Sequence, residues 1–266
     1  MLYTIETITE CIGARRVGTH EATIDWLLTD SRSLSFPEET LFFALTTKRN
    51  KGARYIPELY ERGVRNFVVT QEEFNELTVD NGQLTIAMQH AGSAATVNCQ
   101  LSTVNFLIVG NPLKALQKLA ELHRERFQIP VIGITGSNGK TIVKEWLHQL
   151  LSPDRVIVRS PRSYNSQIGV PLSVWQMNEE AELAIFEAGI SEMGEMRALQ
   201  NMIKPTIGIL TNIGGAHQEN FFSLQEKCME KLSLFKNCDV VIYNADNELI
   251  SNCVSKSMLT AREIAW

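Results

Sequence analysis

Two features are missing from this sequence of 266 residues, and each absence excludes a class of protein. No Cys-x-x-Cys pair occurs, which argues against a structural zinc site or a dithiol redox centre. A basic excess is also missing, because 25 lysines and arginines face 30 aspartates and glutamates. The net charge of −5 gives no general reason to bind nucleic acid or an anionic membrane surface. The cysteines are widely spaced: Cys11, Cys99, Cys228, Cys238 and Cys253.

Long apolar runs are missing as well. Glu6 and Glu10 interrupt the N-terminal segment where a signal peptide would need an unbroken apolar stretch. No later run approaches the length needed to span a bilayer. Together with the scattered cysteines, this predicts a protein of the reducing cytoplasm, without membrane insertion.

The first hundred residues mix short apolar runs with turn-like segments. Residues 41–45, 64–69 and 84–88 have the composition of strands. Residues 54–62 are typical of a helix, and Gly63 is placed to end it. This part of the chain is therefore predicted to form a small α/β domain.

A regular alternation of strands and helices follows. Residues 104–109 form an apolar run, and Asn111 and Pro112 suit the start of a helix that extends to about residue 127. Strands that are apolar throughout, with helices between them, indicate a parallel sheet covered on both faces, whose ligands bind at the carboxyl ends of the strands. Further strands are predicted at 131–135, 156–158, 183–186, 206–210 and 240–243, and helices at 141–151, 193–203 and 224–235.

A glycine-rich turn joins the strand at 131–135 to the next helix. In that context, glycines let backbone N–H groups face phosphate oxygens, a lysine grips the β- and γ-phosphates, and a threonine hydroxyl reaches magnesium. The general Walker pattern has a glycine where Ile134 stands, so a tight turn with a surface lysine is the alternative. We expect a P-loop that binds ATP. The turn consists of Gly136, Ser137, Asn138, Gly139, Lys140 and Thr141.

Three further polar residues occupy unusual positions. Glu187 ends an apolar strand, where it is either a magnesium ligand or a solvated charge. His217 follows another strand, and a lone loop histidine is more often solvated than a ligand. Ser223 and Glu226 form a capping box, and Lys231 falls on the apolar seam of the helix that they begin. Snorkelling of the lysine stem is the ordinary explanation of Lys231.

Taken together, these segments resemble the Mur ligase family, which builds the peptide of bacterial cell-wall precursors. The resemblance covers nearly the whole chain and rests on five elements in the family's order. The elements are Thr-Gly-x-x-Gly-Lys-Thr at 135–141, Glu187-Ala188-Gly189, His217, Lys231 with Leu234 and Phe235, and Asn244-Ala245-Asp246.

The resemblance implies roles for these residues. Lys140, Glu187, His217 and Lys231 are then catalytic, and Asn244 joins the P-loop in binding ATP. Magnesium ligands would come from Thr141, Glu187, His217 and Lys231, with Lys231 carrying a carbamate formed with carbon dioxide.

Two segments narrow the resemblance within the family. Residues 165–171, Asn-Ser-Gln-Ile-Gly-Val-Pro, are similar to a segment of the enzyme that adds D-alanyl-D-alanine. Asp30, Ser31 and Arg32 resemble the signature with which the first domain meets the UDP-sugar, and Asn165 would also contact substrate. The implied reaction joins D-alanyl-D-alanine to UDP-N-acetylmuramoyl-tripeptide, with ATP activating the tripeptide carboxylate as an acyl phosphate.

We therefore expect a small α/β UDP-sugar-binding domain at 1–103, and a P-loop NTPase-like ATP-binding domain with a mostly parallel, helix-covered sheet at 104–266. The family's third, C-terminal domain has no counterpart here, so this fragment alone is expected to be inactive. Fusion of the full-length protein to further domains stays open.

Two rival interpretations are kept. One is another Mur ligase or a folate-polyglutamate-type ligase, against which Asp30-Ser31-Arg32 and residues 165–171 argue. The other is a non-catalytic P-loop module that binds nucleotide and switches a partner. Binding of the UDP-sugar peptide discriminates, because only a Mur ligase requires it.

Overall fold

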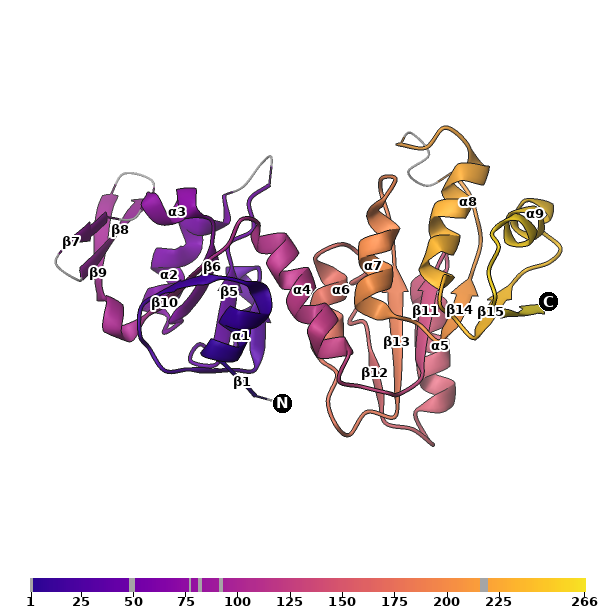
Figure 1. Ribbon diagram of the computed structural model, residues 1–266, viewed down its shortest axis with the longest axis horizontal. Helices are drawn as coiled ribbons and strands as arrows, with labels where there is room; N and C mark the ends of the chain where they lie inside the picture. The colour runs from indigo at the N-terminus through magenta and orange to yellow at the C-terminus, as the bar shows by residue number, and fades with distance from the viewer. Residues whose placement is uncertain (1, 48–50, 77, 81–82, 91–92, 216–219) are drawn as a thin grey trace. The chain divides into compact units, whose positions relative to one another are not determined.

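The computed structural model describes residues 2–47, 51–76, 78–80, 83–90, 93–215 and 220–266, and only the backbone of those between 77 and 99. The chain folds as two compact units, Met1–Leu119 and Ala120–Trp266 (Figure 1). Within those ranges, every helix is too short or too polar to cross a membrane.

The first unit is built on a five-stranded sheet in the order β2-β10-β6-β5-β4. Strand β2 pairs antiparallel with β10, and the other neighbours are parallel. Its strands are β2 (Arg15–Val17), β4 (Trp26–Leu28), β5 (Thr40–Phe43), β6 (Asn66–Val69) and β10 (Asn105–Ile108). The two smaller sheets contain β1 (Tyr3–Thr4), β3 (Thr23–Ile24), β7 (Thr78–Asp80), β8 (Gln83–His90) and β9 (Ser93–Gln100). The helical segments are α1 (Ile5–Ile12), η1 (Ser31–Ser33), η2 (Gly52–Tyr55), α2 (Ile56–Glu61), α3 (Gln71–Asn75) and η3 (Leu101–Thr103).

Aromatic side chains from the central strands fill the core of this unit. The rings of Phe67 and Phe106 stack with centroids 5.5 Å apart, and Phe42 meets Phe67 edge to face. All three phenylalanines are essentially fully buried. Gly63 follows α2 with a φ of 98°, so the predicted helix ends where a residue in the left-handed region is needed.

The boundary between the units lies beyond the predicted position at 103/104. Strand β10 was assigned to the second domain, but it pairs with β6 in the first sheet. An apolar strand fits the inside of either sheet, so composition alone could not assign it. Helix α4 (Pro112–Arg124) continues from the first unit into the second.

The second unit is built on a six-stranded sheet in the order β12-β13-β11-β14-β15-β16. All of its pairings are parallel, as predicted for this domain. Its strands are β11 (Val131–Thr135), β12 (Ile157–Arg159), β13 (Leu183–Ala188), β14 (Ile207–Leu210), β15 (Val240–Tyr243) and β16 (Arg262–Ala265). Its helical segments are α5 (Lys140–Leu151), α6 (Gly169–Val174), α7 (Glu195–Ile203), α8 (Leu224–Leu232), η5 (Ser233–Phe235) and α9 (Glu248–Lys256).

Both faces of this sheet are covered. Because side chains alternate along a strand, Ile132 and Ile134 lie on one face, where Val143 and Leu147 of α5 pack on them. On the other face, residues of α6, α7, α8 and α9 form the larger core. The mixed α/β class and the helix-covered parallel sheet are therefore confirmed.

Candidate functional site

The loops that follow the central strands converge at the carboxyl edge of the parallel sheet. These loops follow β11, β13 and β14, and helix α8 lies beside them. The loops after β11, β12 and β13, together with helix α8, line a cavity of about 140 Å³. Ligands of open parallel sheets bind at this edge, so the cavity is the candidate site. Its lining residues are Gly136, Ser137, Lys140, Asn165, Ser166, Gly189, Ile190, Ser191, Lys227 and Lys231.

Two glycines make the path of the predicted P-loop possible. Gly136 has a φ of 146°, and a Cβ there would lie 2.0 Å from Thr211 Oγ1. Gly139 has a φ of 82° and stands immediately before α5. Both positions therefore require a residue without a side chain.

The P-loop is tied to the segment after β14. The backbone N–H groups of Ser137 and Asn138 donate to the main-chain and side-chain oxygens of Asn212, each over 2.8 Å. Thr211 Oγ1 donates to Asn138 O over 2.6 Å. The N–H groups of the glycine-rich loop were expected to face phosphate, but in this structure these two donate to Asn212. The first N–H groups of a helix have no intrahelical partner, so the start of α5 is the better anion donor.

The side chain of Lys140, the first residue of α5, folds back over the P-loop that precedes it. Its Nζ donates to Gly136 O over 2.9 Å. Burial lowers the pKa of Lys140, the charge of Glu187 opposes that change, and the charge of Lys227 adds to it. The Lys140 ammonium therefore lies at the cavity, where a bound phosphate can replace Gly136 O as its hydrogen-bond acceptor.

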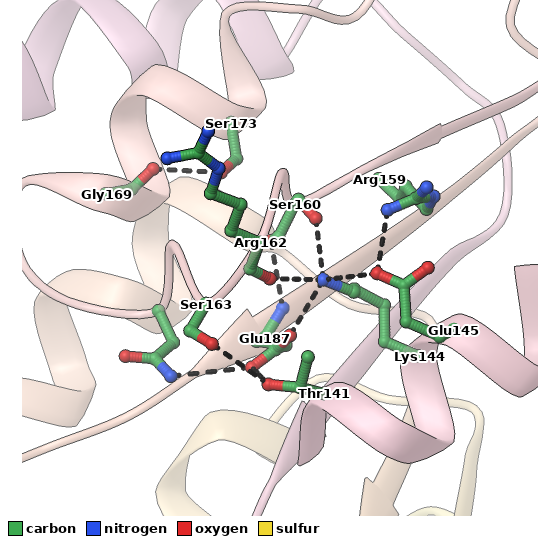
Figure 2. Close-up of polar contacts among 11 residues, drawn as sticks. Thr141, Lys144, Glu145, Arg159, Ser160, Arg162, Ser163, Gly169, Ser173 and Glu187 are labelled. Carbon is green, nitrogen blue, oxygen red and sulfur yellow. Dashed lines mark hydrogen bonds and ion pairs between the residues drawn. The ribbon is translucent and has the colours of Figure 1, made fainter.

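Glu187 lies at the carboxyl end of β13, with none of its side chain exposed. Its Oε2 accepts from Thr141 Oγ1 over 3.0 Å and from Asn165 Nδ2 over 3.4 Å (Figure 2). Its Oε1 lies 3.0 Å from Lys144 Nζ, an ion pair whose angles fall outside those of a hydrogen bond. The alternative of a solvated strand-end charge is wrong, because this carboxylate is buried.

Lys144 is a site residue that sequence reasoning missed. Its fully buried Nζ donates to Ser160 O over 2.8 Å and to Arg162 O (Figure 2). Arg162 has a φ of 48°, which is unusual for a residue with a side chain. One ammonium therefore links Glu187 to a strained turn. The available signal was the spacing, since Lys144 follows Lys140 by one helical turn.

The oxygens of Thr141 and Glu187 fit a magnesium ion. Both are hard ligands, and magnesium keeps several waters, so two protein ligands suffice. In the part of the chain that the structure describes, no group of three or more His, Cys, Asp or Glu side chains could hold a metal. Ser163 Oγ lies 3.3 Å from Thr141 Oγ1 and adds another oxygen. His217 lies outside the described residues.

Lys231 is buried on α8 and lines the cavity, with only 2% of its surface exposed. Burial, with a smaller effect of the nearby charges of Lys140 and Lys227, lowers the pKa of Lys231 to about 7. Glu226 N donates to Ser223 Oγ over 3.1 Å, as predicted for the start of this helix. The Glu226 carboxylate accepts from Phe222 N instead of from the capping residue.

Lys227 is the second lysine that was missed. It is 1% exposed, and its Nζ donates to Gly214 O over 2.7 Å. It precedes Lys231 by one helical turn and lines the same cavity. The predicted site residue Asn244 is not among the lining residues, and its Oδ1 accepts from Asp246 N over 2.8 Å.

The predicted UDP-sugar residues lie in the first unit. Asp30 caps η1, and its carboxylate accepts from the Arg32 guanidinium through both oxygens, at 2.6 and 2.9 Å. These hydrogen bonds hold the pKa of Asp30 below its usual value. The Arg32 side chain is 87% exposed, whereas Ser31 is buried and its carbonyl accepts from Arg62. Arg32 is therefore both oriented and accessible to a ligand.

Comparison with known proteins gives one consistent family. Residues 134–263 match the Mur ligase middle domain. A UDP-N-acetylmuramoyl-tripeptide--D-alanyl-D-alanine ligase of Rickettsia prowazekii is 33% identical over 213 residues, which cover 73% of this chain and 46% of that protein. The ligase of the same name from Bacillus subtilis is 29% identical over 257 residues, which cover 95% of this chain and 50% of that protein. The chain spans about half the length of these curated relatives.

Solved structures agree on the fold. A crystal structure of MurF from Acinetobacter baumannii superposes with a TM-score of 0.81 at 21% identity, covering 100% of this chain and 53% of that one. The MurF ligase of Thermotoga maritima, solved with ADP, superposes with a TM-score of 0.68 at 22% identity, covering 90% of this chain and 49% of that one. The family match, the curated relatives and the shared fold agree, and the chain belongs to the Mur ligase family.

Proposed function

We propose that this chain supplies the UDP-sugar-binding and ATP-binding parts of a ligase that adds D-alanyl-D-alanine to UDP-N-acetylmuramoyl-tripeptide. The observation that carries the proposal is the cavity at the P-loop, where Lys140, Asn165 and Lys231 meet. The names of the relatives from Rickettsia prowazekii and Bacillus subtilis supply the substrate pair. The ADP bound by the Thermotoga maritima neighbour supports a nucleotide at the P-loop.

In this proposal, ATP transfers its γ-phosphoryl group to the terminal carboxylate of the tripeptide. The oxygen–phosphorus bond of the acyl phosphate forms as the bond to ADP breaks. The dipeptide amine then attacks the acyl carbon, and phosphate leaves as the amide forms. Little covalent work falls to the protein, so its contribution is positioning and stabilisation of charge.

Each cavity residue has a part in this scheme. Lys140 leaves Gly136 O and neutralises charge that develops on the phosphoryl oxygens. The N-terminus of α5 binds the preceding phosphates through its unpaired N–H groups. Asn165 holds the Glu187 carboxylate and borders the cavity from the substrate-binding segment.

Thr141 and Glu187 are the residues that would hold magnesium, with His217 and Lys231 as further proposed ligands. Bound magnesium would spread negative charge away from the transferring group. A carbamate on Lys231 would form by attack of its neutral amine on carbon dioxide with loss of a proton. Its burial beside two other lysines favours the neutral amine that this step needs.

The first unit would bind the UDP-sugar through Asp30, Ser31 and Arg32. Since the Arg32 guanidinium is exposed and oriented by Asp30, it can meet a phosphate without reorganisation. Isothermal titration of UDP-N-acetylmuramoyl-tripeptide into Arg32→Ala and Ser31→Ala should show weaker binding than into the wild type. Unchanged affinity in both variants would remove this assignment.

The activity itself is tested with the full-length protein, ATP, the UDP-sugar tripeptide and D-alanyl-D-alanine. The proposal predicts release of ADP and phosphate only when both peptide substrates are present. Turnover with a folate in place of the UDP-sugar would favour the folate-polyglutamate type of ligase. Nucleotide binding without any affinity for the UDP-sugar peptide would favour a non-catalytic P-loop module.

A further inference from the structure

The two oxygens of the Glu187 carboxylate have different surroundings. Oε2 accepts from the hydroxyl of Thr141, the last residue of the P-loop, over 3.0 Å, and from Asn165 Nδ2 over 3.4 Å. Oε1 faces the Lys144 ammonium at 3.0 Å, and among the described residues it accepts no hydrogen bond. A hydroxyl can turn its hydrogen elsewhere, so Oε2 is open to a metal ion, whereas Oε1 is paired with a cation of the protein itself.

A single helix carries both groups that divide the carboxylate in this way. Thr141 and Lys144 are three residues apart on α5, and side chains at that spacing lie on the same face of a helix. Figure 2 shows both side chains meeting Glu187 from this helix. The geometry of α5 therefore fixes the direction in which each oxygen of the carboxylate points.

The Lys144 ammonium is held in place by other oxygens besides that of Glu187. Its Nζ donates to Ser160 O over 2.8 Å and to Arg162 O. Glu145 Oε1 lies 3.1 Å from the same nitrogen. An ammonium has three N–H donors, and burying it is costly unless partners compensate its charge. Lys144 therefore keeps its position when an ion binds at Oε2, and Glu187 cannot turn both oxygens towards that ion.

The distance between the two proposed ligand oxygens suits magnesium. Adjacent ligands of an octahedral ion, each about 2.0–2.1 Å from the metal, lie about 2.9 Å from each other. Thr141 Oγ1 and Glu187 Oε2 are 3.0 Å apart. Magnesium is usually bound by few carboxylates and keeps several waters, whereas calcium takes about six to eight oxygens and can bind both oxygens of one carboxylate. A carboxylate that offers one oxygen therefore favours magnesium.

A second oxygen from Glu187 would favour calcium, and Lys144 prevents that arrangement. A calcium ion bound to Oε1 at about 2.6 Å or less would lie within about 5.6 Å of Lys144 Nζ, because that nitrogen is 3.0 Å from Oε1. Magnesium and calcium carry the same charge, so the general repulsion by the ammonium lowers the affinity for both. The loss of the second carboxylate oxygen, in contrast, weakens calcium binding alone.

We propose that Lys144 is a positioning residue that makes Glu187 a one-oxygen ligand and thereby sets the preference of the nucleotide site for magnesium over calcium. This inference rests on the proposed function, because it requires a nucleotide whose phosphates share the metal ion. Lys144 contacts neither the nucleotide nor the metal, and it acts through the orientation of Glu187.

The test measures how each metal ion changes the affinity for a nucleotide. A non-hydrolysable ATP analogue is titrated into the full-length protein with magnesium, with calcium, or with a chelator in place of both. We expect the wild type to bind the magnesium complex at least about tenfold more tightly than the calcium complex. In Lys144→Met this ratio should fall to about threefold or less, because Glu187 can then offer both oxygens.

The ratio of the two affinities separates positioning from stability. A purely structural role of Lys144 weakens the fold but leaves the ratio unchanged among folded molecules, which would overturn the inference. Lys204, which pairs with Glu125 at the surface, provides the matched control. Lys204→Met should keep the wild-type ratio, and a fall as large as that in Lys144→Met would also contradict the proposal.

A conservative variant covers the case in which Lys144→Met does not fold. Lys144→Arg retains a cation beside Oε1, so it should retain most of the preference for magnesium. Loss of that preference in a folded Lys144→Arg protein would count against the role of Lys144.

The wild-type titrations separate failure of this inference from failure of the proposed function. Equal affinity with magnesium, calcium and chelator would remove the metal from the site, and with it the assignment of Thr141 and Glu187 as ligands. No binding of the analogue under any condition would overturn the nucleotide assignment as well. Binding that magnesium and calcium strengthen equally would overturn this inference alone, because a one-oxygen carboxylate should discriminate between them.

Discussion

Removal of the buried ammonium of Lys144 should destabilise the second unit strongly. Lys144 Nζ and Glu187 Oε1 are 3.0 Å apart, and neither side chain has exposed surface. Breaking one half of a buried ion pair leaves the other charge unpaired, at a cost of about 3–5 kcal/mol. Lys144→Met also removes the donor to Ser160 O, and Met fills nearly the same volume. We therefore expect the free energy of unfolding to fall by about 3–5 kcal/mol.

The same unit offers a matched control at its surface. Lys204 Nζ and Glu125 Oε1 are 2.6 Å apart, but their side chains are 40% and 52% exposed. An exposed pair contributes about 0–1 kcal/mol, so Lys204→Met should change the stability by less than about 1 kcal/mol. Urea unfolding followed by tryptophan fluorescence measures both, with m-values checked for two-state behaviour. Equal losses in the two variants would refute the reasoning, and Lys144→Met with Glu187→Gln should restore part of the stability.

Two further predictions concern the same unit. Burial lowers the pKa of His123 to about 4 from 6.5, so its contribution to stability is complete above pH 6.5 and disappears as the pH falls towards 4. Urea titrations across that range should show a loss of about 3 kcal/mol that is absent in His123→Phe, and an equal loss in the variant would contradict the assignment. Gly136→Ala places a Cβ 2.0 Å from Thr211 Oγ1, so it should abolish nucleotide binding, and unchanged binding in a titration would disprove the loop geometry.

Local patterns in the sequence sufficed for much of the second unit. The strands predicted at 131–135 and 240–243 begin and end at those residues as β11 and β15. Their apolar runs are uninterrupted, and the glycine-rich turn marks the start of α5. The predicted P-loop therefore follows its strand as the motif requires. The helix α6 was missed, because its six residues contain Gly169 and Pro171.

The contacts of the two missed lysines depend on segments that are distant in sequence. Lys144 is buried because Ser160 O and Arg162 O turn towards it, and Lys227 because Gly214 O does. Nothing near either lysine in the sequence shows these partners. Periodicity was also insufficient on α5: Trp146 stands between Val143 and Leu150 at the spacing of an apolar helix face, yet 63% of its surface is exposed. Tertiary packing decides which side of such a helix is covered.

The central claim is that the P-loop cavity binds the phosphates of ATP through Lys140. Isothermal titration of ATP with magnesium into the wild type and Lys140→Ala tests it most directly. A charge-assisted contact to phosphate is worth about 1.5–3 kcal/mol, so the account predicts that the variant binds on the order of 10- to 100-fold more weakly while unfolding at a similar urea concentration. Equal affinity of the two proteins for ATP would contradict it.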